Sequence, residues 1–169
     1  MNVRQATWKD WNRIVGLRLA AFAETLDSDP MLHPGDMALA GFDASLQLGC
    51  WLKDGAITVL LATDQDDLPV GYLVLSTDRS CPYRQERTVW IDGFFVVKSA
   101  RTGVAAGLLM RAAKRLAAKA GIKFAQAVVL AHNTEVHHML RDHGFVAQGV
   151  VYERELDDGR RKLQPEASA

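Results

Sequence analysis

The fold is decided by the stretch IDGFFVVKSARTGVAAGLLMRAAKRLAAKAG, residues 91–121. It begins with apolar and aromatic residues typical of a strand and ends with an Ala-rich segment whose apolar residues recur at helical spacing. A short turn between them carries Arg101, Gly103, Ala105 and Ala106. Open backbone N–H groups and the positive end of the helix dipole make such a helix start suitable for an anion. The stretch therefore predicts a strand, an anion-binding turn and a helix.

The segments around this stretch predict a mixed α/β fold. Hydrophobic periodicity and turn residues predict strands at residues 3–6, 56–63, 70–77, 88–97, 124–131 and 145–155, and helices at residues 7–27, 36–53, 103–120 and 133–143. The order is β-α-α-β-β-β-α-β-α-β. Short turns favour antiparallel pairing of the three central strands, and the crossover helix 103–120 makes the strands that it joins parallel. We expect a central mixed sheet flanked by helices.

The predicted helices also carry predicted buried faces. In the first helix, Thr7 and Asp10 have the spacing of a capping box. The apolar residues expected to face the core there are Trp8, Trp11, Val15, Leu19, Phe22 and Leu26. Those expected to do so in helix 103–120 are Val104, Leu108, Ala112 and Leu116.

Length and composition predict a single cytoplasmic domain, residues 1–156, with a polar tail at residues 157–169. The chain has 49% hydrophobic and 24% charged residues, which is typical of a globular protein. Lys plus Arg and Asp plus Glu number 20 each, so no basic excess favours a nucleic-acid partner. The 2 cysteines lack metal-ligand spacing, and no metal is expected. A polar N-terminus without an apolar run of ~20 residues indicates neither a signal peptide nor a membrane span.

The turn at residues 101–106 leaves two interpretations open on its own. It contains no Gly-Lys-Ser/Thr of a Walker loop and no G-x-G-x-x-G dinucleotide fingerprint. Small residues at a helix start can serve a phosphate site or simply allow close packing of the helix on a sheet.

The element order and two motifs together resemble the GNAT superfamily of acyl-CoA-dependent N-acyltransferases. The motifs are FFVVKSARTGVAAGLL and HNTEVHHMLRDHGF, and the resemblance covers residues 3–155. The family turn is commonly Arg/Gln-x-x-Gly-x-Gly/Ala. Gly103 and Ala105 fit its second half, but Arg101 lies two residues before Gly103 instead of three.

The resemblance implies that acetyl-CoA binds between two parallel strands that splay apart. The pantetheine arm would pair with backbone near Phe95, Val96 and Val97, as an added strand would. Asn133 matches a position where the family often contacts the cofactor arm, and it also fits a helix N-cap. The pyrophosphate would lie on the amides of residues from the turn and helix start: Arg101 (or its side chain), Thr102, Gly103, Val104, Ala105 and Ala106.

The reaction implied is acetyl transfer to a primary amine by direct attack. Candidate bases are Asp92, which could instead be a solvent-facing carboxylate at a strand bulge, and His132, which could instead be a surface or capping histidine. Leu140 stands where much of the family has a Tyr that protonates the leaving thiolate. His137, His138 and His143 do not form an H-E-x-x-H zinc motif.

Two functions therefore remain in view. The first is an N-acetyltransferase acting on a small-molecule or peptide amine. The second is a non-catalytic acyl-CoA-binding or protein-interaction module that kept the fold, which Leu140 and the shortened turn would explain. An exposed final strand could pair with a second chain, so a homodimer is one expected assembly.

Overall fold

The computed structural model describes residues 1–28, 57–77 and 86–149. The strands are β1 (Asn2–Gln5), β2 (Ile57–Thr63), β3 (Pro69–Ser76), β4 (Thr88–Val96) and β5 (Phe124–Ala127). The α-helices are α1 (Trp11–Ser28), α3 (Val104–Lys119) and α4 (Thr134–Asp142). Two 3-10 turns, Trp8–Asp10 and Lys98–Ala100, precede α1 and α3.

The five described strands form one mixed sheet in the order β1-β2-β3-β4-β5. Neighbours from β1 to β4 are antiparallel, and β4 and β5 are parallel. The predicted antiparallel strands with a parallel step after the crossover helix are thus confirmed.

Three predicted elements either differ from the prediction or extend outside the described residues. The helix expected at residues 36–53 lies outside the described residues. The strand expected from Phe145 does not begin there, because residues 145–149 adopt no strand, and its remainder is also outside the described part. β5 ends at Ala127 rather than at Ala131, because its ladder with β4 stops at the pair Ile91 and Ala127.

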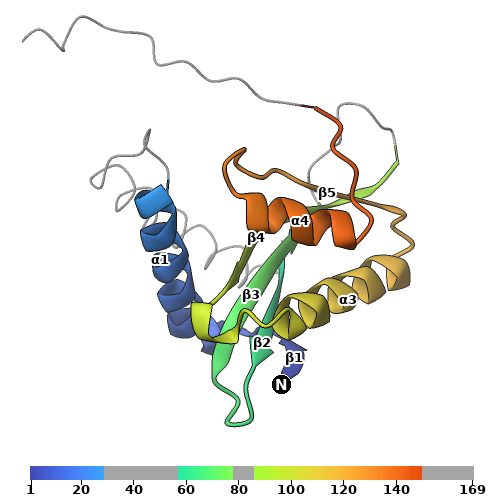
Figure 1. Ribbon diagram of the computed structural model, residues 1–169. Coiled ribbons are helices and arrows are strands. Elements are labelled where there is room, and N and C mark those ends of the chain that lie inside the picture. The colour runs from blue at the N-terminus through green and yellow to red at the C-terminus, as the bar shows by residue number, and fades with distance from the viewer. Residues whose placement is uncertain (29–56, 78–85, 150–169) are drawn as a thin grey trace, which may run out of the picture.

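The helices cover the two faces of the sheet (Figure 1). Helix α1 lies on one side, and α3 and α4 lie on the other. Leu61, Tyr72 and Val74 of the sheet pack on the α1 side with Ile14 and Leu17. A larger core on the opposite side contains residues of the sheet, α3 and α4, including Leu60, Leu73, Leu109, Ala113 and Leu140. The sheet thus separates two hydrophobic cores, one on each of its faces.

The predicted buried faces of two helices were only partly correct. In α1 the buried residues are Ile14 and Leu17, while Leu19 is 50% exposed. In α3 the predicted Ala112 is buried and the predicted Leu116 packs against the core, but Ala105 and Leu109 are buried as well and Val104 is 53% exposed. The inner face of α3 thus combines the large Leu109 and Met110 with alanines, which let the helix backbone approach the sheet closely.

The start of α1 is fixed by Asp10. Its carboxylate accepts hydrogen bonds from both terminal nitrogens of Arg4 at 2.9 and 2.8 Å, and from the Thr7 amide at 2.9 Å. Only 5% of Asp10 is exposed. The hydrogen bonds from Arg4 are the main reason why the Asp10 pKa lies well below its usual 3.8. The predicted capping box is confirmed.

Replacing Asp10 with asparagine is expected to lower the free energy of unfolding at pH 7 by about 2–3 kcal/mol, because Arg4 loses a buried anionic partner. A lowered folded-state pKa stabilises the fold above the unfolded pKa and loses that contribution as the pH falls. The difference between wild type and variant should therefore shrink below pH 3.8. Urea titrations at pH 7 and pH 3 measure it. Asp67→Asn is the control, since exposed Asp67 lies 3.3 Å from the same arginine and should contribute less than about 1 kcal/mol.

Gly71 lets β3 lie close to the end of β4, where it pairs with Val96. A Cβ at this position would meet the Phe95 carbonyl oxygen at 2.8 Å and Val96 Cγ2 at 3.0 Å. Gly71→Ala is expected to lower the free energy of unfolding by about 1–3 kcal/mol through overpacking. Gly16→Ala is the matched control, because Gly16 lies in α1 with nothing within 4 Å and should gain about 0.5–1 kcal/mol. Equal effects of the two changes in thermal and urea unfolding would contradict this prediction.

Candidate active site

Strands β4 and β5 separate at the middle of β4. Their pairing runs from Thr88 with Phe124 to Ile91 with Ala127 and stops. β4 continues to Val96 while paired with β3 on its other edge. From Asp92 to Val96 its outer edge has no strand partner in residues 1–28, 57–77 and 86–149. This is the splay that the sequence predicted.

A β-bulge lies where the strands separate. Val74 pairs with Gly93 and Leu75 pairs with Ile91, so Asp92 is the extra residue of β4. Bulges redirect side chains and are common beside active sites. The Asp92 carboxylate accepts a hydrogen bond of 2.5 Å from the Ser76 hydroxyl. The prediction that Asp92 lies at a strand bulge is therefore confirmed. Its side chain is half-buried rather than fully open to solvent.

The open edge of β4 presents alternate backbone groups. The Val97 amide donates to Val70 of β3 at 2.9 Å, whereas the Val96 carbonyl faces outward and accepts from Arg101. Since successive residues of a strand point their backbone groups to opposite edges, Phe94 and Val96 face the gap. Of the predicted set Phe95, Val96 and Val97, only Val96 offers its backbone groups there.

The start of α3 provides the expected open amides. Gly103, at φ +81°, precedes the helix, and its carbonyl accepts the first helical bond from the Gly107 amide at 3.0 Å. The amides of Val104, Ala105 and Ala106 come before that bond and have no acceptor within the helix. The Thr102 amide is engaged with the Ala100 carbonyl at 2.8 Å.

The side chains of the turn point in different directions. Gly103 and Ala106 line a cleft, Thr102 and Val104 are exposed outside it, and Ala105 is 0% exposed within the core. The Ala105 side chain therefore contributes packing, and only its backbone amide belongs to the open helix start.

The gap between β4, α1 and the starts of α3 and α4 is a cleft of about 470 Å³, which is within the range of small-ligand pockets. It contains seven of the predicted residues: Phe95, Val96, Arg101, Gly103, Ala106, His132 and Asn133. Its other lining residues include Ala21, Glu24, Thr25, Phe94, Glu135 and Met139.

Arg101 spans the cleft. Its Nε donates to the Val96 carbonyl at 2.8 Å, and a terminal nitrogen donates to Glu24 of α1 at 2.5 Å. Glu135 of α4 lies 3.8 Å from the other terminal nitrogen, and the Phe95 ring centroid lies 5.5 Å from the guanidinium carbon. Arg101 thus occupies the outward carbonyl of β4, and it would have to move for another group to pair there.

Asn133 and His132 lie at the start of α4. Asn133 Oδ1 accepts from the Val136 amide at 3.2 Å, so the predicted N-cap is confirmed. His132 is exposed on the cleft, and its carbonyl accepts from the Thr134 amide at 2.9 Å. Asp92 does not line the cleft that contains His132.

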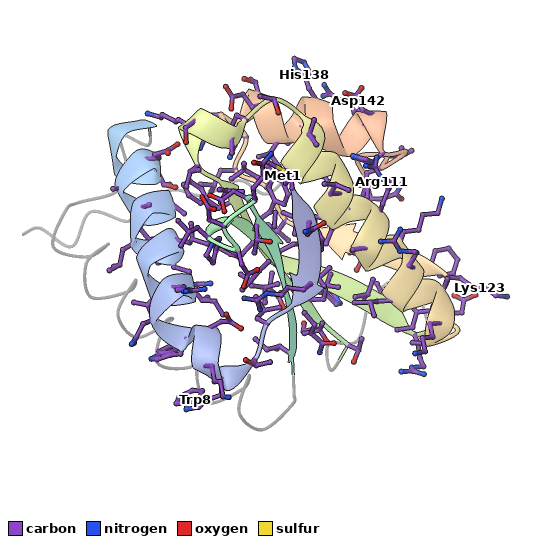
Figure 2. All side chains as sticks on the ribbon, turned by 90° about the horizontal axis from the view of Figure 1, so that it is seen from below. Met1, Trp8, Arg111, Lys123, His138 and Asp142 are labelled. Atoms are coloured by element: carbon purple, nitrogen blue, oxygen red, sulfur yellow. The ribbon has the colours of Figure 1, made fainter. Side chains whose placement is uncertain are left out.

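The remaining histidines and Leu140 lie apart from this cleft. His138 points away from the body of the protein in Figure 2, and His137 Nε2 lies 3.2 Å from the Leu130 carbonyl. Within the described residues, no three His, Cys, Asp or Glu side chains are placed to hold a metal ion. Leu140 is buried in the core and does not line the cleft.

Glu24 is the main cleft residue that sequence reasoning missed. A signal was present, because Ile14, Leu17, Ala21 and Glu24 recur at steps of three and four along one stripe of α1. A carboxylate continuing a buried stripe calls for a partner. The stripe could be recognised only once the correct face of α1 was known.

Within the described residues, an open strand edge beside open helix amides is an arrangement that can accommodate a phosphate-bearing chain in extended form. The matching family model, the acetyltransferase (GNAT) family, covers residues 20–145. The chain belongs to the GNAT acetyltransferase family, so it is a transferase of the acyl-transferring kind. Among the curated proteins, none matches this chain.

Solved structures share the fold over nearly the whole chain. A putative acetyl transferase from Pyrococcus furiosus is 15% identical with a TM-score of 0.73, and the match covers 92% of this chain and 99% of that one. AAC(6')-Iy, in complex with the bisubstrate analog CoA-S-monomethyl-acetylneamine, is 21% identical with a TM-score of 0.66, covering 92% and 97%. Ribosomal-protein-alanine N-acetyltransferase from Brucella melitensis biovar Abortus 2308 is 16% identical with a TM-score of 0.64, covering 92% and 100%.

The position of α3 favours a second alignment of the family turn. Taking Arg101, Val104 and Ala106 as its three fixed positions keeps the family spacing without a deletion. Val104 then replaces a glycine at the first residue of α3, where its exposed side chain has room. This alignment also accounts for why Ala106 rather than Ala105 lines the cleft.

No described helix has the length and apolar character required to cross a bilayer.

Proposed function

We propose that this chain is an N-acetyltransferase that moves an acetyl group from acetyl-CoA to a primary amine by direct attack in a ternary complex. The observation that supports it is the joining, in one cleft, of the outward backbone groups of β4 and the open amides of α3. Extended thioester chains and pyrophosphates need these two features. The proposal keeps the expected cytoplasmic location, with no metal.

The residues of the cleft fit the donor as follows. The backbone of Phe94 and Val96 would pair with the pantetheine arm, and the amides of Val104 and Ala106 would hold the pyrophosphate. The Arg101 side chain would leave the Val96 carbonyl and turn toward the phosphates. The Val96 amide would donate to the oxygen of the reacting carbonyl, because the Val97 amide is already engaged by Val70.

The chemistry requires proton transfers that balance. An ammonium must lose one proton before it attacks, and we assign its removal to Asp92, directly or through water, with His132 as the second candidate. As the N–C bond forms and the C–S bond breaks, the second proton ends on the sulfur of CoA. Leu140 cannot supply it, since it has no dissociable proton and is buried in the core.

A non-catalytic acyl-CoA-binding or protein-interaction module is the second candidate. Two observations favour it. Leu140 provides no proton donor where much of the family has a Tyr, and Arg101 is held across the cleft by Glu24 and the Val96 carbonyl. It predicts that no amine in a broad panel yields CoA.

Calorimetric titration with acetyl-CoA, with ADP as the control, tests whether the cleft binds the donor. We expect micromolar binding that ADP does not reproduce. A panel of amines assayed for release of free thiol then tests the reaction. Binding without amine-dependent thiol release would support the non-catalytic module. Absence of binding would overturn acetyl transfer and leave only the protein-interaction form of the second candidate.

A further inference from the structure

Two charged residues that do not line the donor cleft lie where α1 covers the sheet: Arg18 of α1 and Asp92 of β4. Alternate residues of a strand share a face, so Tyr72, Val74 and Ser76 point the same way, and the first two pack with α1. Because Asp92 accepts a hydrogen bond from the Ser76 hydroxyl, its carboxylate lies on this face too. The bulge thus presents the carboxylate on the side of the sheet opposite α3.

Arg18 of α1 lies beside the same bulge. A Cβ at Gly93 would meet Arg18 Nη1 at 3.7 Å and Tyr72 Cε2 at 3.2 Å. Gly93 has no side chain, so Arg18 Nη1 can lie near the backbone of the residue that follows Asp92. No ion pair joins Arg18 to Asp92 in the described parts of the chain.

The guanidinium of Arg18 forms no ion pair with any carboxylate of the described residues. Its Nε is buried without any hydrogen-bond acceptor. Its guanidinium carbon lies 5.3 Å from the centroid of the Phe22 ring. Buried N–H donors are nearly always paired. Arg18 as a whole is only partly buried, but its buried and unpaired Nε, beside the strand that carries Asp92, is a place where an anionic ligand could bind. No carboxylate in residues 1–28, 57–77 and 86–149 supplies it.

We propose that Arg18 binds the carboxylate of the acceptor while Asp92 receives its amine, so that the acceptor is a free amino acid. An amine and a carboxylate joined by a few bonds match a cation and an anion presented by adjacent parts of one face. A guanidinium binds a carboxylate through two parallel hydrogen bonds, which gives orientation as well as affinity. This inference rests on the proposed acetyl transfer and names the acceptor class of that same site.

Two neighbouring side chains agree with this assignment. Burial raises the pKa of Tyr72, so its phenol stays neutral and does not compete as an anion for Arg18. Trp90 points to the same face as Ser76, its register partner, and its buried indole N–H has no acceptor either. The face therefore holds two unpaired donors, as expected of a site for a ligand rich in oxygen.

The test compares each amino acid with the amine that lacks its carboxylate. The twenty amino acids are assayed singly for thiol release from acetyl-CoA, with ethylamine, isopentylamine and phenethylamine as counterparts of alanine, leucine and phenylalanine. The wild-type protein should prefer at least one amino acid to its amine counterpart. Arg18→Met should raise the KM for that amino acid about 10- to 100-fold, the range for a lost hydrogen bond to a charged group, and leave the KM for the amine unchanged.

Arg18→Lys and Arg13→Met are the comparison variants. Lysine keeps the charge but not the paired hydrogen bonds, so part of the preference should return. Arg13 lies on the exposed side of α1 and donates to the Asp67 carbonyl at 3.4 Å, far along the chain from the bulge. Arg13→Met should behave as the wild type. Unchanged acetyl-CoA titration and thermal unfolding of Arg18→Met confirm that the fold is retained.

The possible results separate this inference from the proposed function. Thiol release with amines and amino acids alike, unaffected by Arg18→Met, would overturn the inference and leave acetyl transfer intact. If no acceptor gives thiol release, acetyl transfer fails, and calorimetry with the amino acids decides the inference by itself. Amino-acid binding that is lost in Arg18→Met would support it, and no binding of any amino acid to the wild type would overturn it.

Discussion

Replacing Asp92 with asparagine is expected to lower kcat for amine acetylation about 10²- to 10⁴-fold, the range for removal of a general base. The affinity for acetyl-CoA should stay within roughly twofold of the wild type, because Asp92 does not line the donor cleft. Asparagine keeps an oxygen able to accept the 2.5 Å hydrogen bond from Ser76, so the bulge should persist. Steady-state kinetics of thiol release and calorimetry measure the two quantities.

Asp142→Asn is the control for this variant. Asp142 ends α4 on the outside of the protein (Figure 2), so the same chemical change there should leave kcat unaltered. A kcat of Asp92→Asn equal to the wild type would refute the assignment of the base and turn attention to His132. Histidine is the side chain whose charge ordinarily changes near neutral pH.

Replacing Ala106 with glutamate is expected to weaken acetyl-CoA binding about 10- to 100-fold, because it places a negative charge at the helix start assigned to the pyrophosphate. Ala106 is the third residue of α3 and lines the cleft. The same change should raise the free energy of unfolding by about 0.3–1 kcal/mol, since an acidic side chain in the first turn favours the helix dipole. Loss of binding and gain of stability should thus occur in one variant.

Ala106→Gln separates charge from size. Glutamine has nearly the same shape as glutamate without the charge, so it should bind acetyl-CoA more tightly than Ala106→Glu. Raising the salt concentration should narrow the difference between the two variants. Equal dissociation constants for both at low salt would show that no phosphate lies near this helix start.

The sequence predicted the sheet and the turn because their signals are local. The strands near residues 57–63, 69–76 and 88–96 are apolar runs with short connections, and Gly103, Gly121 and Gly144 mark helix ends with positive φ. Asn133 was recognisable as a cap from its own position alone. Each of these features depends on neighbours within a few residues.

The helix faces could not be predicted as well. In α1, one stripe through Trp8, Leu19 and Phe22 and another through Ile14 and Leu17 both satisfy a period of 3.6. The choice between them depends on how the Asp10 and Arg4 pair orients the start of the helix on the sheet, which is a tertiary contact. Leu19 and Val104 were therefore expected inside and lie at the surface.

The candidate site combined both kinds of information. The sequence identified Gly103, Ala106 and Val96 as site residues, because the strand end and the turn to which they belong are adjacent in the chain. Contacts between distant segments were missed. Glu24 meets Arg101 across 77 positions of the chain, and Arg18 lies against Gly93. No single-sequence pattern pairs such residues, and only the packing of α1 on β4 brings them together.

The separation of β4 from β5 also bears on how the protein behaves without its donor. The open edge of a strand is a template to which strands of other chains can add, and proteins commonly protect such edges with charge. Arg101 gives this protection at the end of β4, because its side chain covers the Val96 carbonyl with a fixed cation. A ligand that fills the gap completes the ladder and binds only the native state, so it stabilises the fold in proportion to the logarithm of its concentration. The ligand-free protein should therefore be the form most prone to edge-to-edge aggregation, and acetyl-CoA should act as its stabiliser during purification.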